Sequence, residues 1–267
     1  YFKRDYMRLA SWNINSVRLR VKHIIDFIRK YEIDVICLQE TKTQDIFFPE
    51  EEFLRFGWGY SYFRGEKSYN GVAIVSRIPI KTKSYLNWCG KLDTRHIFVV
   101  LENNLAIHNF YVPAGGDLPD IKKNIKFKQK IQFLKEMISY FKNDKKNSKI
   151  LVGDLNIAPL EYDVWSHKQL LNIISHTPIE TNLFKELLNS GDFIDIIRSK
   201  AGEKEKLYSW WSYRSKDWKK FNKGRRLDHI LVSKKIKSSI ISNHIYTELR
   251  SWKEPSDHVP VVTNLDC

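Results

Sequence analysis

The segment KILVGDLN, residues 149–156, ends an apolar run with a carboxylate and an amide two residues apart. In an extended backbone, alternate side chains point to the same side, so Asp154 and Asn156 would face one common space. A turn is the simpler interpretation, because glycine, aspartate, asparagine and proline all favour turns and all four occur within residues 153–159. The other interpretation is a buried strand whose end presents an acid and an amide for chemistry.

Five further segments place polar side chains beside an apolar run. They are LASWNIN with Asn13 and Asn15, VICLQE with Glu40, AIHNFYVPAGG with Tyr111, RRLDHILV with Asp228, and PSDHVPVV with Asp257 and His258. One strand that ends in a carboxylate can be a simple turn. Several such strand ends, carrying carboxylate, amide, hydroxyl and imidazole groups, indicate one site assembled along one edge of a β-sandwich.

The residue types predict metal-assisted phosphoryl chemistry. Glu40, Asp154 and Asp257 offer hard oxygen ligands, which suit Mg²⁺ or Mn²⁺ better than zinc, whose sites use cysteine and histidine at fixed spacing. The sequence contains no Walker loop, Rossmann glycine fingerprint or Gly-x-Ser-x-Gly elbow. Carboxylates with a histidine and a tyrosine suit phosphodiester hydrolysis, in which a metal neutralises charge on the phosphoryl oxygens and a carboxylate aligns or deprotonates water.

The elements that position these residues are short apolar strands alternating with fewer helices, without a linker or repeat. Strands are predicted at residues 9–14, 35–38, 71–76, 97–101, 105–111, 149–153, 193–197, 209–213, 227–232, 244–248 and 259–263. Helices are predicted at residues 21–31, 121–141 and 182–189. So many strands exceed one simple parallel sheet, which predicts an α/β fold of two packed sheets flanked by helices. We expect a single domain over residues 7–267, with residues 1–6 as an N-terminal extension.

Composition and charge limit which partners and which cellular compartment are expected. The formal net charge of +14 favours a polyanionic partner such as nucleic acid, although a lysine-rich codon bias would also produce it. No apolar stretch reaches the length of a bilayer span, so no membrane partner is expected. The three cysteines are scattered and lack metal-site spacing, which indicates a reducing, intracellular compartment.

Seven motifs together carry a family resemblance. SWNIN, ICLQETK, YNGVAI, YVPAGG, GDLNIAP, GRRLDHI and SDHVPV occur in this order between residues 11 and 262. In type and order they resemble the exonuclease III family of apurinic/apyrimidinic (AP) endonucleases, bacterial type, within the endonuclease/exonuclease/phosphatase superfamily. The resemblance implies a four-layer, deoxyribonuclease I-like sandwich of two mixed β-sheets flanked by helices.

The same resemblance implies an activity. It predicts a Mg²⁺-dependent enzyme of base excision repair, with Mn²⁺ as a substitute, that cuts double-stranded DNA 5′ to abasic sites. It also implies 3′-to-5′ exonuclease and 3′-phosphodiesterase activity on blocked 3′ ends, a monomeric state and a cytoplasmic location.

Site roles follow from the resemblance motif by motif. The implied metal-site residues are Asn13, Glu40, Asp154, Asn156, Asp257 and His258. The implied catalytic residues are Tyr111, Asp154, Asn156, Asp228 and His258. Glu40 resembles the principal metal ligand, and Asp154 resembles the residue that positions or deprotonates the attacking water. Asp228 would orient His258 and keep it protonated against the phosphate, because a carboxylate partner raises the pKa of an imidazole.

Substrate specificity is expected in aromatic and basic loops. The implied DNA-binding residues are Trp210, Trp211, Arg225, Arg226 and Leu227. In the family, the two segments that contain these residues, here SWWSYR and KGRRLD, form the walls of the pocket for the extruded, baseless sugar. Alternation leaves open that one tryptophan lies in the core, and the arginine pair could be merely solvated. Ala114 stands where many relatives carry asparagine or glutamine, so an amide contact to the phosphate is missing or supplied elsewhere. Asn15 stands where the animal-type enzymes have aspartate, which weakens any case for a second metal.

Two alternatives remain open at the level of sequence. One is another phosphodiesterase or phosphatase of this fold acting on a phosphoinositide or lipid. The other is a non-catalytic DNA-binding relative with a decayed site. The tyrosine, the GRRLD segment, the tryptophan pair and the basic charge favour DNA over the first alternative. The presence of every expected ligand disfavours the second.

Overall fold

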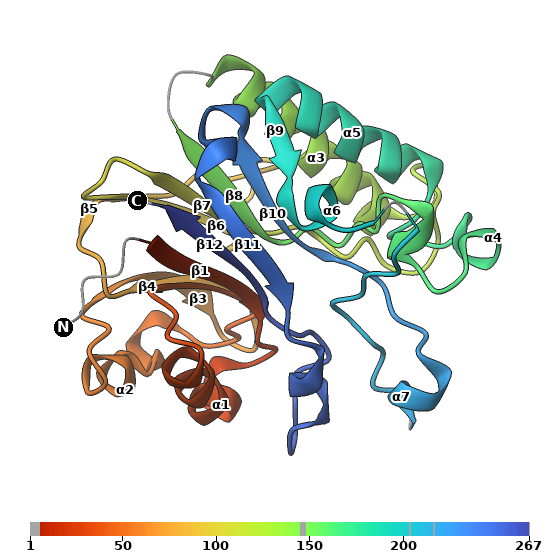
Figure 1. The fold of residues 1–267 in the computed structure, drawn as a ribbon. Coiled ribbons are helices and arrows are strands. Elements are labelled where there is room, and N and C mark those ends of the chain that lie inside the picture. Colours follow the sequence, from red (N-terminus) through yellow and green to blue (C-terminus); the bar gives the residue numbers. More distant parts are fainter. Residues whose placement is uncertain (1–5, 145–147, 203, 216, 267) are drawn as a thin grey trace.

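Two six-stranded β-sheets pack face to face, and helices cover both outer faces (Figure 1). The structure is a computed structural model that describes residues 6–144, 148–202, 204–215 and 217–266. The layers run from α1 and α2 through the two sheets to α3 and α5 (Figure 1). The predicted sandwich of two mixed sheets flanked by helices is confirmed.

The first sheet has the strand order β11-β12-β1-β2-β4-β3. Its strands are β1 (Tyr6–Asn13), β2 (Val35–Gln39), β3 (Tyr60–Glu66), β4 (Tyr69–Ser76), β11 (Ile240–Ile245) and β12 (Val261–Asp266). β1 pairs parallel with β2, and the other pairs are antiparallel, so the sheet is mixed.

The second sheet has the strand order β5-β6-β7-β8-β10-β9. Its strands are β5 (Ile80–Ser84), β6 (His96–Leu101), β7 (Ala106–Tyr111), β8 (Lys149–Asp154), β9 (Phe193–Asp195) and β10 (Asp228–Ser233). Here β7 and β8 are the parallel pair, in a register that places Tyr111 beside Asp154.

The helices differ widely in length. The α-helices are α1 (Val17–Lys30), α2 (Glu50–Leu54), α3 (Ile125–Asn143), α4 (His167–Leu170), α5 (Pro178–Gly191), α6 (Ile196–Lys200) and α7 (Trp218–Phe221). Four 3₁₀ turns are η1 (Asp45–Phe47), η2 (Glu161–Asp163), η3 (Lys234–Ser239) and η4 (Thr247–Ser251). Among the described residues, none of the helices combines the length and the hydropathy that a membrane span requires.

The core divides into three apolar layers because strand side chains alternate between faces. On β8, Ile150 and Val152 face the other sheet, whereas Leu151 faces α3 and α5. Each such side chain is fully buried and contributes about 1.5–3 kcal/mol to folding. The sheets are therefore held rigidly against each other, and so are the polar residues at their ends.

Several predicted element boundaries were wrong. The predicted strand at residues 209–213 forms only isolated bridges at Trp210. The one predicted at 193–197 divides into β9 and α6, where the Asp195 side chain caps the helix by accepting the Arg198 N–H. The strands β3 and β5 were not predicted at all. Residues 1–5 of the predicted extension lie outside the described residues, and Tyr6 already belongs to β1.

A buried histidine pair links β6 to β7. His96 Nδ1 accepts the Leu86 N–H at 3.2 Å, so its proton resides on Nε2, which lies 3.2 Å from His108 Nδ1. Burial lowers the pKa of His96 well below its ordinary value and the pKa of His108 to about 3. Both rings are therefore neutral in the folded protein at any pH near neutrality.

This pair predicts a loss of stability in mild acid. An unfolded histidine titrates near pH 6.5, so below that value the unfolded chain binds protons that the folded chain does not. The free energy of unfolding is expected to fall by about 1.4 kcal/mol per pH unit for each ring, about 2.7 for the pair. Urea unfolding between pH 7.5 and 5 measures this slope.

The control for this slope replaces the exposed His244 with glutamine, which should leave it unchanged. The double variant His96→Gln/His108→Gln should have a slope shallower by about 2.7 kcal/mol per pH unit. An equal slope in wild type and double variant would show that the pair does not bind protons differently in the two states.

Candidate active site

The chemistry-bearing side chains meet where strands of both sheets begin or end. Asn13 closes β1, Asp154 closes β8 and Asp228 opens β10. Glu40 follows β2 directly, and His258 lies shortly before β12. Antiparallel register places Asp228 opposite Asp154 on neighbouring strands of the second sheet. One edge of the sandwich therefore gathers acids, an amide and an imidazole from segments far apart in sequence.

The centre of the site is a cluster of Glu40, Asp154 and His258. One ligand atom from each of the three lies within 4.8 Å of the others. Asn13 Nδ2 donates to Glu40 Oε1 and to Asp154 Oδ2, both at 2.9 Å, so one amide holds the two carboxylates in place. Two carboxylate oxygens that face the same space match the hard donors preferred by Mg²⁺ and Mn²⁺.

Lys42 belongs to this site although the sequence interpretation assigned it no role. Its Nζ lies 2.7 Å from Glu40 Oε2 and donates to Asn15 Oδ1 at 2.5 Å. Burial alone raises the pKa of Glu40, but the Lys42 ammonium and the Asn13 amide outweigh it and lower the pKa below its ordinary value. Glu40 is therefore ionised at neutral pH. The signal was available, because Lys42 stands two residues after Glu40 in LQETK.

The end of β8 is a strand end and a turn at once. Asn156 has a left-handed backbone with φ 54°, a conformation that asparagine adopts more readily than most residues. Its N–H donates to Asp154 Oδ1 at 2.9 Å, and its Nδ2 donates to the Val112 carbonyl at 2.9 Å. Gly153 has φ 139°, and a Cβ there would overlap the Phe110 carbonyl oxygen. The GDLN segment therefore combines the predicted strand end with the predicted turn, and together they fix the Asp154 carboxylate.

His258 is tied to the second sheet through Asp228. His258 Nδ1 lies 2.8 Å from Asp228 Oδ2, which also accepts the Ser209 hydroxyl at 2.6 Å. The other ring nitrogen, Nε2, lies 3.7 Å from Asp154 Oδ2. Burial alone lowers the pKa of His258, but the carboxylates of Asp228 and Asp154 raise it to about 10. The ring is therefore an imidazolium at neutral pH, with one N–H held by Asp228 and the other facing the cluster.

The pKa values of Asp154 and Tyr111 are both shifted upward. Burial raises the pKa of Asp154 to about 7; the His258 imidazolium opposes this rise, and the Asp228 carboxylate adds to it. Burial and the carboxylates of Glu40 and Asp154 raise the pKa of Tyr111 well above its ordinary value. Tyr111 therefore keeps its proton, and its hydroxyl hydrogen-bonds to Glu40.

Asp257 lies beside the cluster without joining it. Asn15 Nδ2 donates to Asp257 Oδ1 at 3.1 Å, and Trp210 Nε1 donates to Asp257 Oδ2 at 2.9 Å. Among the described residues, the group whose ligand atoms converge contains Glu40, Asp154 and His258 alone. The predicted metal-site residues are thus brought to one edge, but the Asp257 carboxylate is engaged by two other donors.

Three of the five predicted DNA-binding side chains are buried. Trp211 is 3% exposed and packs against Tyr208 and Trp218, and Leu227 is 4% exposed. Arg226 is fully buried; two of its nitrogens bind the two oxygens of Asp163, each at 2.8 Å.

Burial limits the contact that these three side chains can make with DNA. An arginine that meets carboxylates inside the protein, Asp195 among them at 2.7 Å, has no guanidinium face left for a phosphate. A buried tryptophan or leucine offers no ring or methyl surface to a duplex. Trp210 and Arg225 are the two members of the set that remain partly exposed.

Comparison with known proteins fits this geometry. Residues 10–258 match the Endonuclease/Exonuclease/phosphatase family. The chain belongs to this family. It is 31% identical to Exodeoxyribonuclease III of Haemophilus influenzae and 30% identical to an exodeoxyribonuclease of Bacillus subtilis. Both matches cover 96% of this chain and 98% of the relative.

Solved structures of family members superimpose closely. An AP endonuclease from Archaeoglobus fulgidus has a TM-score of 0.91 at 29% identity, covering 98% of this chain and 100% of that one. The 3′ phosphatase NExo from Neisseria, bound to a product DNA hairpin, has a TM-score of 0.90 at 27% identity with the same coverage. The predicted resemblance to the exonuclease III type of the family is confirmed, as is the enzyme class, a hydrolytic nuclease.

A buried ion pair between α3 and α5 contacts the turn at Asn156. Lys130 Nζ lies 2.5 Å from Glu180 Oε1 and donates to the carbonyl of Asn156 at 2.7 Å. Glu180 accepts N–H bonds from Ser175 and Thr177, and both charged side chains are fully buried. No signal in the sequence identified the pair, because the two residues lie on different helices, fifty positions apart.

Removing the ammonium of this pair is expected to destabilise the protein strongly. Lys130→Met leaves the Glu180 carboxylate buried and unpaired, so the free energy of unfolding should fall by about 3–5 kcal/mol. Urea unfolding at pH 7.5 measures the change. Lys128→Met, an exposed substitution on the same helix, is the matched control and should change stability little. The double variant Lys130→Met/Glu180→Gln should recover part of the loss, and a double variant no better than Lys130→Met would contradict the pairing argument.

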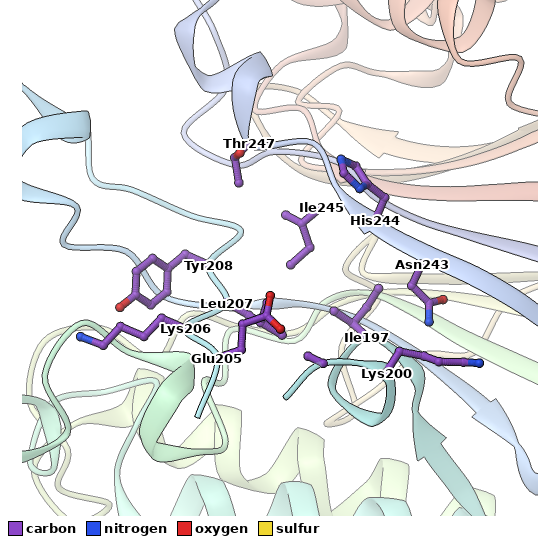
Figure 2. A pocket seen from close by; sticks show the side chains of 11 residues that line it. Ile197, Lys200, Glu205, Lys206, Leu207, Tyr208, Asn243, His244, Ile245 and Thr247 are labelled. Carbon is purple, nitrogen blue, oxygen red and sulfur yellow. The ribbon is translucent and has the colours of Figure 1, made fainter. Parts of the chain in front are cut away.

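A separate cavity of about 350 Å³ lies between α6 and β11 (Figure 2). Its lining includes Lys200 of α6, Asn243 and His244 of β11, and Tyr208 of the loop before Ser209 (Figure 2). No member of the cluster lines this cavity. This cavity is therefore separate from the cluster of Glu40, Asp154 and His258.

Proposed function

We propose that this chain is a Mg²⁺-dependent DNA repair nuclease that hydrolyses the phosphodiester 5′ to an abasic site in double-stranded DNA. The proposal includes 3′-to-5′ exonuclease and 3′-phosphodiesterase activity on blocked 3′ ends. The observation that carries it is the convergence of Glu40, Asp154 and His258 at one sheet edge, with Asp228 behind the histidine. This arrangement belongs to a chain of +14 net charge whose relatives are named as DNA nucleases.

The residues present fit a hard divalent cation. Glu40 and Asp154 would hold it, since the Asn13 amide already fixes one oxygen of each carboxylate. His258 is assigned to the phosphate instead of the metal, because its pKa is raised to about 10 and an imidazolium cannot ligate a cation. Mg²⁺ bound there would neutralise charge on the phosphoryl oxygens of the substrate.

The side chains of the site then have different roles in the hydrolysis. Asp154 aligns the attacking water and accepts its proton. Asn156, fixed by its left-handed turn, holds Asp154 and the water in register. His258 donates its Nε2–H to a phosphoryl oxygen, while Tyr111 offers a second hydroxyl near Glu40. Rigid strands hold these groups within the tolerance that catalysis requires.

Recognition of the abasic site is assigned to the exposed part of the basic and aromatic segments. Trp210 and Arg225 form the wall toward which a baseless sugar is extruded, and extrusion is easiest where no base has to be unstacked. One chain supplies the whole cluster, which supports action as a monomer. The free thiols Cys37 and Cys89 suit a reducing compartment such as the cytoplasm.

The proposal is tested with a duplex that contains one tetrahydrofuran abasic analogue, with Mg²⁺ or with EDTA. The analogue cannot undergo β-elimination, so Mg²⁺-dependent cleavage immediately 5′ to it reports hydrolysis alone. That result is expected. Absence of cleavage, together with Mg²⁺-dependent phosphate release from an inositol or lipid substrate, would overturn the assignment of DNA as the substrate.

A further inference from the structure

Three residues from different segments stand in a row beside the cluster. Trp210 is the antiparallel bridge partner of both His258 and Arg225. Directly opposite residues of antiparallel strands place their side chains on the same face, with Cα atoms about 5 Å apart. The side chains of His258, Trp210 and Arg225 therefore share one face, and Arg225 stands about 10 Å from His258 along the row.

The Arg225 guanidinium is held in place without being neutralised. Its centre lies 5.4 Å from the centre of the Trp210 ring. Its Nη1 donates to the Ile174 carbonyl at 3.1 Å and to Ser175 Oγ at 2.9 Å, both neutral acceptors. Its Nε is buried without a hydrogen-bond partner. In the part of the chain that the structure describes, Arg225 forms no salt bridge, whereas the neighbouring Arg226 binds two carboxylates.

We propose that Arg225 forms a subsite for a second anionic group of the substrate, on the far side of the sugar or blocking group from the phosphate bound by His258. This inference rests on the proposed function, which sets the scissile phosphate at His258 and the extruded group against Trp210. A guanidinium fixed by neutral acceptors and stacked on an aromatic ring is ready to bind an oxyanion through its remaining N–H groups. The subsite makes Arg225 a residue that determines specificity.

Two substrates can supply the second anion. In a continuous strand it is the phosphate that follows the abasic sugar. At a broken 3′ end it is a carboxylate on the blocking group, as in a 3′-phosphoglycolate. The chemistry is the same in both, a negatively charged oxygen group one linker beyond the scissile phosphate. A substrate neutral at that position would leave the guanidinium unpaired and so would be discriminated against.

The test compares charged and neutral partners in matched substrates. One pair is a tetrahydrofuran duplex whose next 3′ linkage is either a phosphodiester or a neutral methylphosphonate. The other pair is a nicked duplex whose 3′ end carries either phosphoglycolate or the neutral phosphoethanol. We expect wild type to prefer the charged member by about tenfold or more in kcat/KM, and Arg225→Gln to reduce this preference to less than about twofold.

Two variants separate this role from general effects. Lys223→Gln removes one exposed charge from the same segment, outside the row, and should keep the preference. Arg225→Lys keeps the charge but loses the planar guanidinium, so it should keep only part of the preference, which separates charge from geometry. Preference in both pairs, or in only one, supports the subsite and identifies the source of the anion.

Other outcomes overturn the proposal. Equal rates of wild type on charged and neutral members of both pairs would show that no second anion is bound, while cleavage itself would still support the proposed function. The same conclusion follows when Arg225→Gln loses one common factor on every substrate. A wild-type protein that cuts none of the four substrates would remove the proposed function and this inference together.

Discussion

Replacing Asp154 with asparagine is expected to lower turnover on abasic DNA by about 10³-fold or more, about 4 kcal/mol of activation free energy. The carboxylate lies within hydrogen-bonding reach of Asn13 and Asn156 and near His258, so it faces the space where water and phosphate meet. Asparagine keeps the size of the side chain but cannot accept a proton. DNA affinity should stay nearly intact, because the phosphate contacts come from other groups.

Single-turnover cleavage of the tetrahydrofuran duplex and equilibrium binding to the same duplex provide the two measurements. Asp26→Asn removes one partly exposed carboxylate from α1, which pairs with Lys22 and is not a member of the site, and serves as the charge-matched control. Near-normal turnover in Asp154→Asn would remove the role assigned to this residue. Equal losses in turnover and binding would instead indicate a disturbed fold, which urea unfolding of the variant would reveal.

The positions of the main site residues could be predicted because strands convert sequence spacing into spatial direction. Apolar runs such as Ile150–Val152 identified buried strands, and the polar residue at each end had to lie at a sheet edge. Parallel and antiparallel pairing then bring these ends together, as in the pairs Tyr111–Asp154 and Asp228–Asp154. The local pattern therefore placed each polar residue at a strand end, and the long-range pairing of the strands brings these ends together.

Burial of polar side chains could not be predicted in the same way. Arg226 and Arg225 are adjacent and chemically identical, yet one meets Asp163 and Asp195 in the core while the other remains partly exposed. They differ because two carboxylates from remote segments of the chain form ion pairs with Arg226. Lys130 is a similar case, since Glu180 comes from another helix and makes an otherwise solvated lysine a core residue.

The segment at residues 209–213 shows a different limit. Its aromatic residues have high strand propensity, but such residues form a strand only where neighbouring strands are available to pair and pack with them. Here Trp210 pairs with one residue on each side, Arg225 and His258, and neither flanking segment continues alongside it. The result is a three-residue row instead of a strand. That row places a ring and a guanidinium beside the catalytic imidazole, which a regular strand pairing elsewhere would not do.

Replacing His258 with glutamine is expected to lower kcat/KM by about 10³-fold, near the upper end for one preorganised donor. Glutamine can still donate a hydrogen bond, but it lacks the positive charge that opposes charge on the phosphoryl group. The Asp228–Ser209 pair behind the ring is left without its cationic partner. Cleavage kinetics at saturating Mg²⁺ measure the loss, with the exposed His244→Gln as the matched control.

A companion variant tests why the histidine is charged. Asp228→Asn removes the carboxylate that most favours the imidazolium, so the pKa of His258 should fall from its value of about 10. This sets the direction of the pH dependence. In wild type the His258 ring keeps its proton up to about pH 9, whereas in the variant it loses the proton as the pH rises through the lowered pKa. Activity of Asp228→Asn should therefore decline toward alkaline pH, where wild type is flat. A variant that is merely slower, by the same factor at every pH, would mean that Asp228 positions the ring without setting its charge.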